Sequence, residues 1–370
     1  MINIEVIVAR EETGYELYNG YWSIFFMQYD LLKKLGIKFK FSVSLNVKNL
    51  KADIYILSSR FFKKKTDFID QKHLEILEII KSKNKKIIWF DMRDSAGTTQ
   101  FEVLPYVDLY IKKQFYKDLN SYKQKLYGGR VYSDFYNQKF NIKDQNIYRM
   151  KKLDDGDEEK LLLGWNIGVR NFSRTMTNRS LKSIQYMTDI FKTRLNFGLK
   201  KKDIEFESHD TNRCFDLVAN HGKNISRNSV RFQRELFDKK FRDYFKGNIN
   251  VGEKVPIQRY YKTLMNSKVL ISLYGWGEIC YKEFEATICG CCFIMPDMSN
   301  IETWPNIYQK EKTYLPIKWD LSNLEDIYKK VIKNSDLRIK LVKNSQKEIQ
   351  SVRNEIGYNY FLNIFERIIN

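Results

Sequence analysis

The sequence predicts an α/β protein built from two doubly wound, Rossmann-like domains. Its 370 residues exceed the usual size of one compact core. Short β-branched runs alternate with helical segments, a pattern that gives parallel sheets. The alternation restarts after a polar, charged stretch near the middle of the chain. We therefore expect an N-terminal domain over residues 1–197 and a C-terminal domain over residues 198–370, which ends in a helical tail.

The first domain is predicted from apolar runs that are each followed by a loop and a helix. IEVIVA opens the chain's first strand, and a glycine-containing loop leads from it into an aromatic helix. Residues 137–160 are polar and read as an excursion or linker. The expected strands are 4–9, 52–59, 85–91, 107–113 and 161–169, and the expected helices are 21–35, 73–82 and 179–194.

The second domain is predicted from a second series of such runs, which begins at KKDIEFESHD. The join between the domains is expected near residues 195–202. The expected strands are 203–208, 268–274 and 291–296, and the expected helices are 227–244, 258–266, 278–289 and 321–333, followed by a charged helical tail to residue 370. Ligands of such domains bind at the carboxyl ends of the strands.

Composition indicates a globular protein with a positive field. The chain is 43% hydrophobic with only 5 Pro and 17 Gly, which is enough apolar surface to fold. Its net charge of +19 would attract nucleic acid, anionic lipid or phosphorylated small molecules, although a biased genome composition would explain it equally well. The opening lacks a signal peptide, no run of eighteen apolar residues occurs, and the five cysteines suit a reducing compartment, so we expect a cytoplasmic protein.

The stretch SLYGWGEICYKEFEATICGCC, residues 272–292, carries the strongest functional pattern. The predicted helix 278–289 would place Glu278, Lys282 and Glu285 on one face, just after a strand's carboxyl end, where helix N-termini favour anions. Gly275 and Gly277 permit close approach of a ligand, Lys282 can neutralise phosphate, and Glu285 can accept two hydroxyl hydrogen bonds from ribose. These features predict a nucleotide site, and the alternative is a solvated charged stripe.

The same stretch resembles the nucleotide-sugar segment of GT-B glycosyltransferases, and is closest to capsule-type and exostosin-like members. The matching positions are the Gly275-Trp276-Gly277 turn, Lys282, Glu285-Ala286, Gly290 and Phe293–Pro296, and the resemblance covers about residues 200–350. It implies that Glu285 holds the ribose, that Lys282 holds phosphate and that no metal is obligatory. Six residues separate Glu278 from Glu285, where the commonest bacterial group has seven, which leaves the role of Glu278 open.

Three arginines follow the loop HGKNIS at the start of a predicted helix. Arg227, Arg231 and Arg234 fall on one helical face, where guanidinium groups can bind a diphosphate; an exposed basic stripe is the alternative. Arg227 and Arg231 are the better candidates because they lie nearer the helix N-terminus.

In the first domain, IIWFDMRDSAGTTQF places Asp94 just past a strand's carboxyl end. A carboxylate that faces the donor can deprotonate an acceptor hydroxyl, so Asp94 is the candidate catalytic base of an inverting enzyme. The alternative is that Asp91 or Asp94 caps a loop or helix.

Two metal signals are weak. Cys289, Cys291 and Cys292 lack a second pair of ligands at zinc spacing, and we expect them to pack as small apolar residues. The Asp155-Gly156-Asp157 sequence lies in the charged linker and not at a strand end. His209 could face the cleft or cap its strand. We therefore expect no metal site.

The sequence and the GT-B resemblance together favour a glycosyltransferase with a nucleotide sugar as donor and a glycan or lipid-linked molecule as acceptor, in surface polysaccharide or glycoconjugate synthesis. Lysines and aromatics interleave in residues 60–65 and 110–125, which suits an anionic membrane surface at the inner face of the membrane, single-stranded nucleic acid, or plain solvated surface. We do not expect nucleic acid as the partner. The alternatives are a non-catalytic nucleic-acid-binding protein, and an epimerase or polyol-phosphate transferase on the same scaffold.

Overall fold

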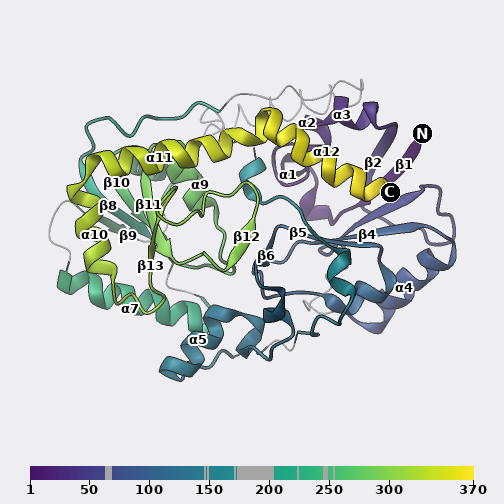
Figure 1. Ribbon diagram of the computed structural model, residues 1–370, viewed down its shortest axis with the longest axis horizontal. Helices are drawn as coiled ribbons and strands as arrows, with labels where there is room; N and C mark the ends of the chain where they lie inside the picture. Colours follow the sequence, from purple (N-terminus) through teal and green to yellow (C-terminus); the bar gives the residue numbers. More distant parts are fainter. Residues whose placement is uncertain are drawn as a thin grey trace.

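The computed structural model describes residues 1–62, 69–145, 147, 150–170, 172, 204–222, 225–244, 249–252 and 255–370. Two parallel sheets, one in each half of the chain, lie beside each other with helices over their faces (Figure 1). The predicted helix 179–194, the join near 195–202 and the boundary between residues 197 and 198 all lie outside the described residues.

The first sheet has six parallel strands in the order β2-β1-β3-β4-β5-β7. Its strands are β1 (Ile2–Ile7), β2 (Ile37–Ser42), β3 (Ile54–Ser58), β4 (Lys86–Asp91), β5 (Leu109–Lys112) and β7 (Leu161–Leu163). The predicted strands are confirmed except that the last one ends at Leu163, and β2 was not predicted. The helices are α1 (Tyr15–Asn19), α2 (Ser23–Met27), α3 (Tyr29–Lys34) and α4 (Gln71–Ser82), so that the predicted helix 21–35 is divided at Gln28.

The second sheet has five parallel strands in the order β13-β11-β10-β8-β9. Its strands are β8 (Phe215–Asn220), β9 (Ile249–Gly252), β10 (Ser267–Ile271), β11 (Cys292–Pro296) and β13 (Leu315–Ile317), and its flanking helices are α7 (Asn228–Tyr244), α8 (Ile257–Met265), α9 (Tyr281–Ile288) and α10 (Leu324–Lys333). The prediction of a strand at 203–208 is wrong, because residues 204–208 run without strand pairing and β8 takes that place.

Both sheets share one topology. Counted along the chain within each sheet, the strand order is 2-1-3-4-5 in both, with β7 added as a sixth strand at the edge of the first sheet, and this order is that of a doubly wound Rossmann-like domain. The order reverses between β1 and β3 in the first sheet and between β8 and β10 in the second. Ligands of such sheets bind at the carboxyl ends of the strands beside this switch point, so each sheet has one expected site.

The C-terminal tail consists of α11 (Ser335–Gln350) and α12 (Glu355–Ile369). The sequence analysis assigned the whole tail to the second domain, but α12 packs on the first sheet instead (Figure 1). Phe361 and Phe365 are fully buried there, and the ring of Phe365 lies 5.4 Å from that of Phe25 in α2. The last residues of the chain therefore complete the first domain's core.

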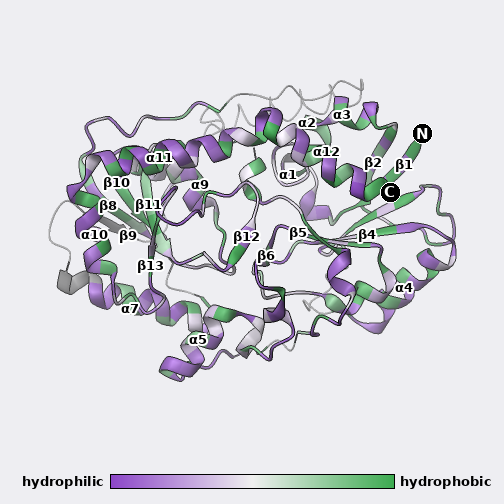
Figure 2. Ribbon diagram, viewed as in Figure 1, coloured by the Kyte–Doolittle hydropathy of each residue, from purple (hydrophilic) through white to green (hydrophobic). Residues whose placement is uncertain are grey.

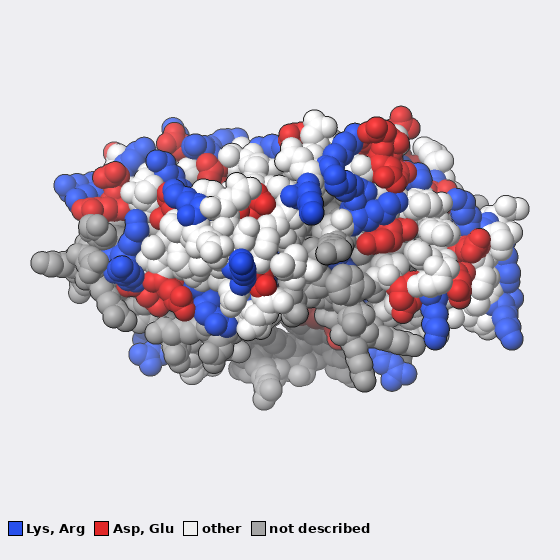
Figure 3. Space-filling model, turned by 90° about the horizontal axis from the view of Figure 1, so that it is seen from below, with Lys and Arg blue, Asp and Glu red and all other residues white. Residues whose placement is uncertain are grey.

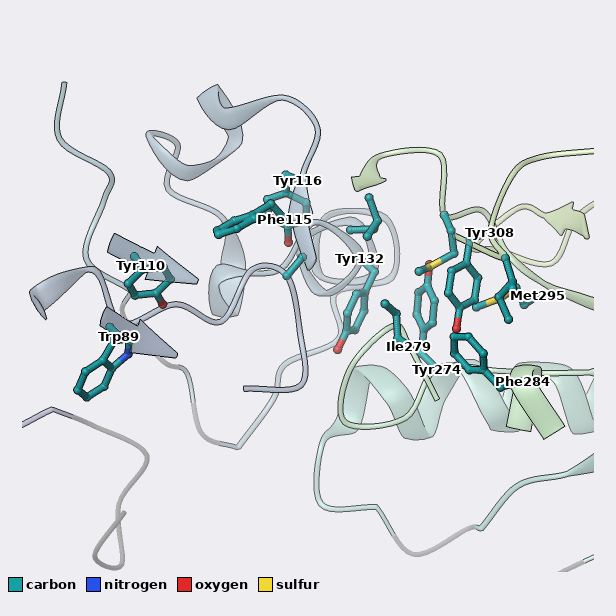
Figure 4. Packing of buried hydrophobic residues seen from close by; sticks show 14 of the residues in the cluster. Trp89, Tyr110, Phe115, Tyr116, Tyr132, Tyr274, Ile279, Phe284, Met295 and Tyr308 are labelled. Carbon is teal, nitrogen blue, oxygen red and sulfur yellow. The ribbon is translucent and has the colours of Figure 1, made fainter. Parts of the chain in front are cut away.

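The two domains share a long contact. Strand β6 (Gln114–Tyr116) follows the first sheet and pairs antiparallel with β12 (Ile301–Thr303) from the second half. Helix α5 (Val131–Phe140) contacts α7, where Gln233 donates to the Tyr136 hydroxyl at 2.7 Å. Figure 4 shows buried rings that continue from the first domain through Tyr132 and Tyr274 into the second. One cluster of buried apolar side chains therefore continues from the first domain into the second.

Hydropathy follows this arrangement. The strands of both sheets are mainly hydrophobic, whereas the outer helices alternate hydrophobic and hydrophilic residues (Figure 2). On the face drawn in Figure 3, positive and negative side chains are intermixed. In the described part of the chain, no helix combines the length and the apolar character needed to cross a bilayer.

Candidate active site

A pocket of about 370 Å³ lies between the two domains, at the carboxyl ends of both sheets. One wall comes from loops after β1, β3, β4 and β5 of the first domain, and the other comes from the loop after β10 of the second. The lining residues are Glu11, Glu12, Glu16, Tyr21, Trp22, Arg60, Met92, Asp94, Lys113, Ile167, Gly275, Trp276, Gly277, Ile279, Cys280 and Tyr281. The first sheet's switch point and the Gly-Trp-Gly turn thus face the same space.

The Gly275-Trp276-Gly277 turn brings the second domain against the first. A Cβ atom on Gly277 would lie 1.7 Å from the carbonyl oxygen of Asp94, so only glycine fits there. Trp276 is 55% exposed at the pocket wall, and the guanidinium of Arg227 stacks 5.3 Å from its ring centre. The predicted donor turn and the predicted base are therefore neighbours.

Asp94 lines the pocket from the first domain, and its main chain is in contact with this turn. Its carboxylate lies 3.0 Å from the ammonium of Lys113, a residue that is only 6% exposed. The attraction of Lys113 lowers the pKa of Asp94 below its usual range, which keeps the carboxylate ionised at neutral pH. An ionised carboxylate that is half exposed to a pocket is able to accept a proton from a ligand hydroxyl.

Asp91 stabilises the loop that carries Asp94 by accepting hydrogen bonds. Its carboxylate accepts from the backbone N–H of Arg93 at 2.9 Å, from the Tyr110 hydroxyl at 2.6 Å and from the Lys112 ammonium at 2.6 Å. Lys112 also donates to the carbonyl of Thr98 at 3.0 Å. The capping role offered as the alternative is thus the one that Asp91 has.

Glu278 lies in the turn before α9, which begins at Tyr281, so the prediction that Glu278 shares a helical face with Lys282 and Glu285 is wrong. Its side chain is directed to the first domain. The carboxylate accepts from Ser95 Oγ at 2.8 Å, from the backbone N–H of Ala96 at 3.1 Å and from Gln114 Nε2 at 2.7 Å. These bonds hold the two domains together.

Lys282 and Glu285 lie on α9 and are not among the residues that line the pocket just described, although Cys280 and Tyr281 at the start of α9 are. Glu285 accepts a hydrogen bond from the Tyr261 hydroxyl at 3.0 Å, and burial raises the pKa of its carboxyl. Lys282 is half-buried, and within the described part of the chain its ammonium has no ion-pair partner within 4.0 Å. Both side chains lie near the second sheet's switch point and not in this pocket. Their binding of phosphate and ribose therefore stays a prediction.

The three arginines have different partners. Arg227 donates to the Tyr132 hydroxyl at 2.7 Å and to the carbonyl of Trp276 at 2.6 Å, so it supports the Gly-Trp-Gly turn. Arg231 donates to the carbonyl of Ile225 at 2.8 Å. Arg234 is buried and donates to the carbonyls of Gly222 and Tyr274, which joins the carboxyl ends of β8 and β10.

The structure adds a residue that the sequence analysis did not single out. His221 directly follows β8 at the second switch point and is 8% exposed. Its Nε2 atom lies 3.0 Å from Asp238, whereas its Nδ1 atom has no hydrogen-bond partner in the described part of the chain. Burial lowers the pKa of this histidine. Its position directly after a strand at the switch point was the signal that could have found it.

His209 and the cysteines Cys289, Cys291 and Cys292 have structural positions. His209 is buried away from the pocket, with Nδ1 2.6 Å from the carbonyl of Gly290 and Nε2 accepting from Arg338 at 3.0 Å. Cys289, Cys291 and Cys292 are buried at the junction of α9 and β11, as expected for apolar packing. Among the described residues, no group of three or more His, Cys, Asp or Glu is arranged to hold a metal ion.

Comparisons with known proteins give similarity at the level of architecture. No family model and no curated protein matches this chain. Solved structures that are similar over the whole of this chain include T4 phage BGT with UDP-glucose (11% identity, TM-score 0.43, 100% of that chain) and a glycosyltransferase from Rickettsia africae (10%, 0.44, 99%). A putative UDP-N-acetylglucosamine 2-epimerase from Listeria monocytogenes is similar to the same degree (9%, 0.42, 97%).

The chain has the GT-B fold. Its two sheets of identical strand order, and the pocket at the carboxyl ends of both, are the features that define it here. The fold alone does not fix the reaction, which depends on the side chains of the site.

Proposed function

We propose that the protein is a glycosyltransferase that moves a sugar from a nucleotide-sugar donor to a hydroxyl group of a glycan or lipid-linked acceptor. One observation carries the proposal: the ionised carboxylate of Asp94 and the Gly-Trp-Gly turn lie side by side in the lining of one interdomain pocket. That is the geometry that an acceptor hydroxyl, a donor and a base require.

In the proposed reaction, Asp94 accepts the proton of the acceptor hydroxyl as its oxygen attacks the anomeric carbon. The bond from that carbon to the diphosphate oxygen breaks, and the nucleoside diphosphate leaves with the electron pair. Attack opposite the leaving group inverts the anomeric configuration. Lys282 and the N-terminal end of α9 offset the charge that develops on the diphosphate, and Glu285 accepts hydrogen bonds from the ribose.

Arg227 and Arg231 have supporting places in this proposal. Arg227 donates to the carbonyl of Trp276 in the Gly-Trp-Gly turn, and Arg231 donates to the carbonyl of Ile225 in the loop that precedes α7. Arg227 already contacts the Gly-Trp-Gly turn, and Arg231 lies one helical turn after Arg227, so both are proposed to bind the diphosphate. No metal ion is needed, so we expect transfer to persist in EDTA. We also propose a role in surface polysaccharide or glycoconjugate synthesis at the inner face of the membrane.

A thermal-shift panel tests the donor site directly. UDP, GDP, CMP, ADP and their sugars are compared on the wild type, on Glu285→Ala and on Glu325→Ala, which lies exposed on α10 and serves as the matched control. We expect one nucleotide to stabilise the wild type and the control equally, and Glu285→Ala to lower its affinity by about 10- to 100-fold. The donor assignment fails if no nucleotide stabilises the wild type, or if Glu285→Ala responds like the control.

Product analysis separates the alternatives. A glycosyltransferase releases nucleoside diphosphate only when an acceptor is present or water replaces it. A polyol-phosphate transferase releases nucleoside monophosphate, and an epimerase changes the sugar without net release in each cycle. Steep salt-dependent binding to DNA or RNA, with no response to any nucleotide sugar, would instead support a nucleic-acid-binding protein that uses the +19 charge.

A further inference from the structure

We propose that Glu278 is a positioning residue, which fixes the loop of the base Asp94 against the donor turn so that the two move as one unit. We call residues 94–97 the base loop and residues 275–277 the donor turn. The inference rests on the proposed function, since it assigns Glu278 a part in orienting the catalytic base. It replaces the nucleotide-binding role that the sequence pattern predicted for this residue.

Glu278 uses both carboxylate oxygens on the first domain. One oxygen accepts from Ser95 Oγ at 2.8 Å, and the other accepts from the Ala96 N–H at 3.1 Å and from Gln114 Nε2 at 2.7 Å. Ser95 and Gln114 are fully buried, and Glu278 is 3% exposed. Glu278 does not contribute to the lining of the interdomain pocket, so its carboxylate is directed at the base loop and not at the ligand space.

Gln114 and Gly277 also hold the base loop, through the main-chain carbonyl of Asp94. The side-chain amide of Gln114 that contacts Glu278 also donates to the carbonyl of Asp94 at 2.9 Å. Gly277, the residue before Glu278, packs on that carbonyl with no space for a Cβ atom. The main chain of Asp94 is therefore fixed by the donor turn, while its side chain is fixed by Lys113.

The charge on Glu278 makes this joint specific. A buried carboxylate is costly unless hydrogen bonds replace its hydration, and here the three donors, Ser95 Oγ, the Ala96 N–H and Gln114 Nε2, all come from the first domain. No cation lies within ion-pair distance of Glu278 in the described part of the chain. Any shift of the donor turn away from the base loop would leave the carboxylate of Glu278 without hydrogen-bond donors. The base loop and its residue Asp94 are therefore expected to move together with the donor turn.

The substitution Glu278→Met tests the proposal with little change of volume. Methionine has no carboxylate, so the Ser95 hydroxyl, the Ala96 N–H and the Gln114 NH₂ group all lose the acceptor that they share. Glutamine would be a weaker test, because its oxygen can accept from Ala96 and Gln114 while its NH₂ group donates to Ser95 Oγ. The matched control is Glu302→Met, because Glu302 is an exposed glutamate on β12 in the same interdomain region.

We expect Glu278→Met to leave donor affinity within about twofold of the wild type, measured by titration calorimetry, and to leave the donor KM unchanged. We expect kcat to fall by about 100-fold, the loss that misplacement of a catalytic group by about 1 Å causes. The control should change neither quantity. A fall of tenfold or more in donor affinity, with kcat retained, would show that Glu278 is a nucleotide ligand and would overturn the proposal.

Amide hydrogen exchange gives a readout that does not depend on activity. In Glu278→Met, peptides that contain residues 94–98 should exchange at least tenfold faster, whereas peptides from β4 and β10 should not change. Unchanged exchange in the base loop overturns the proposal even if kcat falls. If the wild type neither binds a donor nor transfers a sugar while the loop still loosens, the proposed function fails and the interdomain joint is retained.

Discussion

Asp94 and Lys113 form the residue pair on which the proposed chemistry depends. Because Lys113 lowers the pKa of Asp94, the wild type should lose activity on the acid side only at low pH. Lys113→Met removes that attraction, so the pKa of Asp94 rises and the acidic limb of the kcat/KM profile should move to higher pH. Lys117→Met, at an exposed lysine four residues along, should leave the profile in place. An acidic limb that is the same in Lys113→Met and the wild type would exclude Asp94 as the base.

Beneath the base loop, Lys112 and Asp91 form a pair whose side chains are both fully buried, with a distance of 2.6 Å. Removing one partner leaves the other charge buried without compensation. We expect Lys112→Met to lower the free energy of unfolding by about 3 to 5 kcal/mol, measured by urea denaturation. The double variant with Asp91→Asn should regain part of this loss, since no buried charge is left and the amide can still bond to the Arg93 N–H and the Tyr110 hydroxyl. A double variant less stable than Lys112→Met would contradict this account.

At the scale of elements, local patterns predicted most strands, and long-range pairing decided the rest. Residues 203–208 alternate apolar and charged side chains as a half-buried strand does, yet the neighbour of β10 is β8, at Phe215–Asn220. Strand β2 carries lysines at alternate positions on the edge of its sheet and lacks the apolar run that identified the central strands. Helix α9 begins at Tyr281 because the carboxylate of Glu283 accepts from the N–H of Cys280, and cysteine is not a residue that signals an N-cap.

The candidate site was predictable to the extent that it follows strand ends. Asp94 and the Gly-Trp-Gly turn could be found because each directly follows a buried strand. The partners of Glu278 could not be found, because Ser95 lies 183 residues away in the sequence and no local pattern records that contact. The same limit applies to Arg227, whose partners Tyr132 and Trp276 come from separate elements.

His209 bonds to the end of α9 and to α11, and its burial makes the free energy of unfolding depend on pH. It joins the end of α9 at Gly290 to Arg338 in α11, and burial lowers its pKa to about 4. The unfolded chain binds a proton near pH 6.5, so the stabilising contribution is present above that pH and is lost as pH falls towards 4. Between pH 7 and 4.5, wild type should lose about 2 kcal/mol more unfolding free energy than His209→Gln. Urea midpoints at both pH values measure this difference, and equal losses would contradict it.

At the scale of the whole molecule, the C-terminal helix makes the two domains interdependent. Helix α12 leaves the second domain and supplies Phe361, Ile364, Phe365 and Ile368 to the core of the first. The β6–β12 pair and the shared apolar core connect the domains a second and a third time. A chain connected in this way should unfold as one unit, although proteins of two domains commonly show separate transitions.

Phe365→Ala in α12 tests this coupling, because Phe365 is fully buried against Phe25 and its truncation should cost about 3 to 5 kcal/mol. If the molecule unfolds as one unit, exchange protection should fall equally in peptides from β3 and β4 of the first domain and in peptides from β10 and β11 of the second. Ile356→Ala, at a 60% exposed position on the same helix, should change neither. Loss of protection confined to the first domain would show that the interdomain contacts position the domains without coupling their stability. In that case the donor turn would stay folded after the base loop had unfolded.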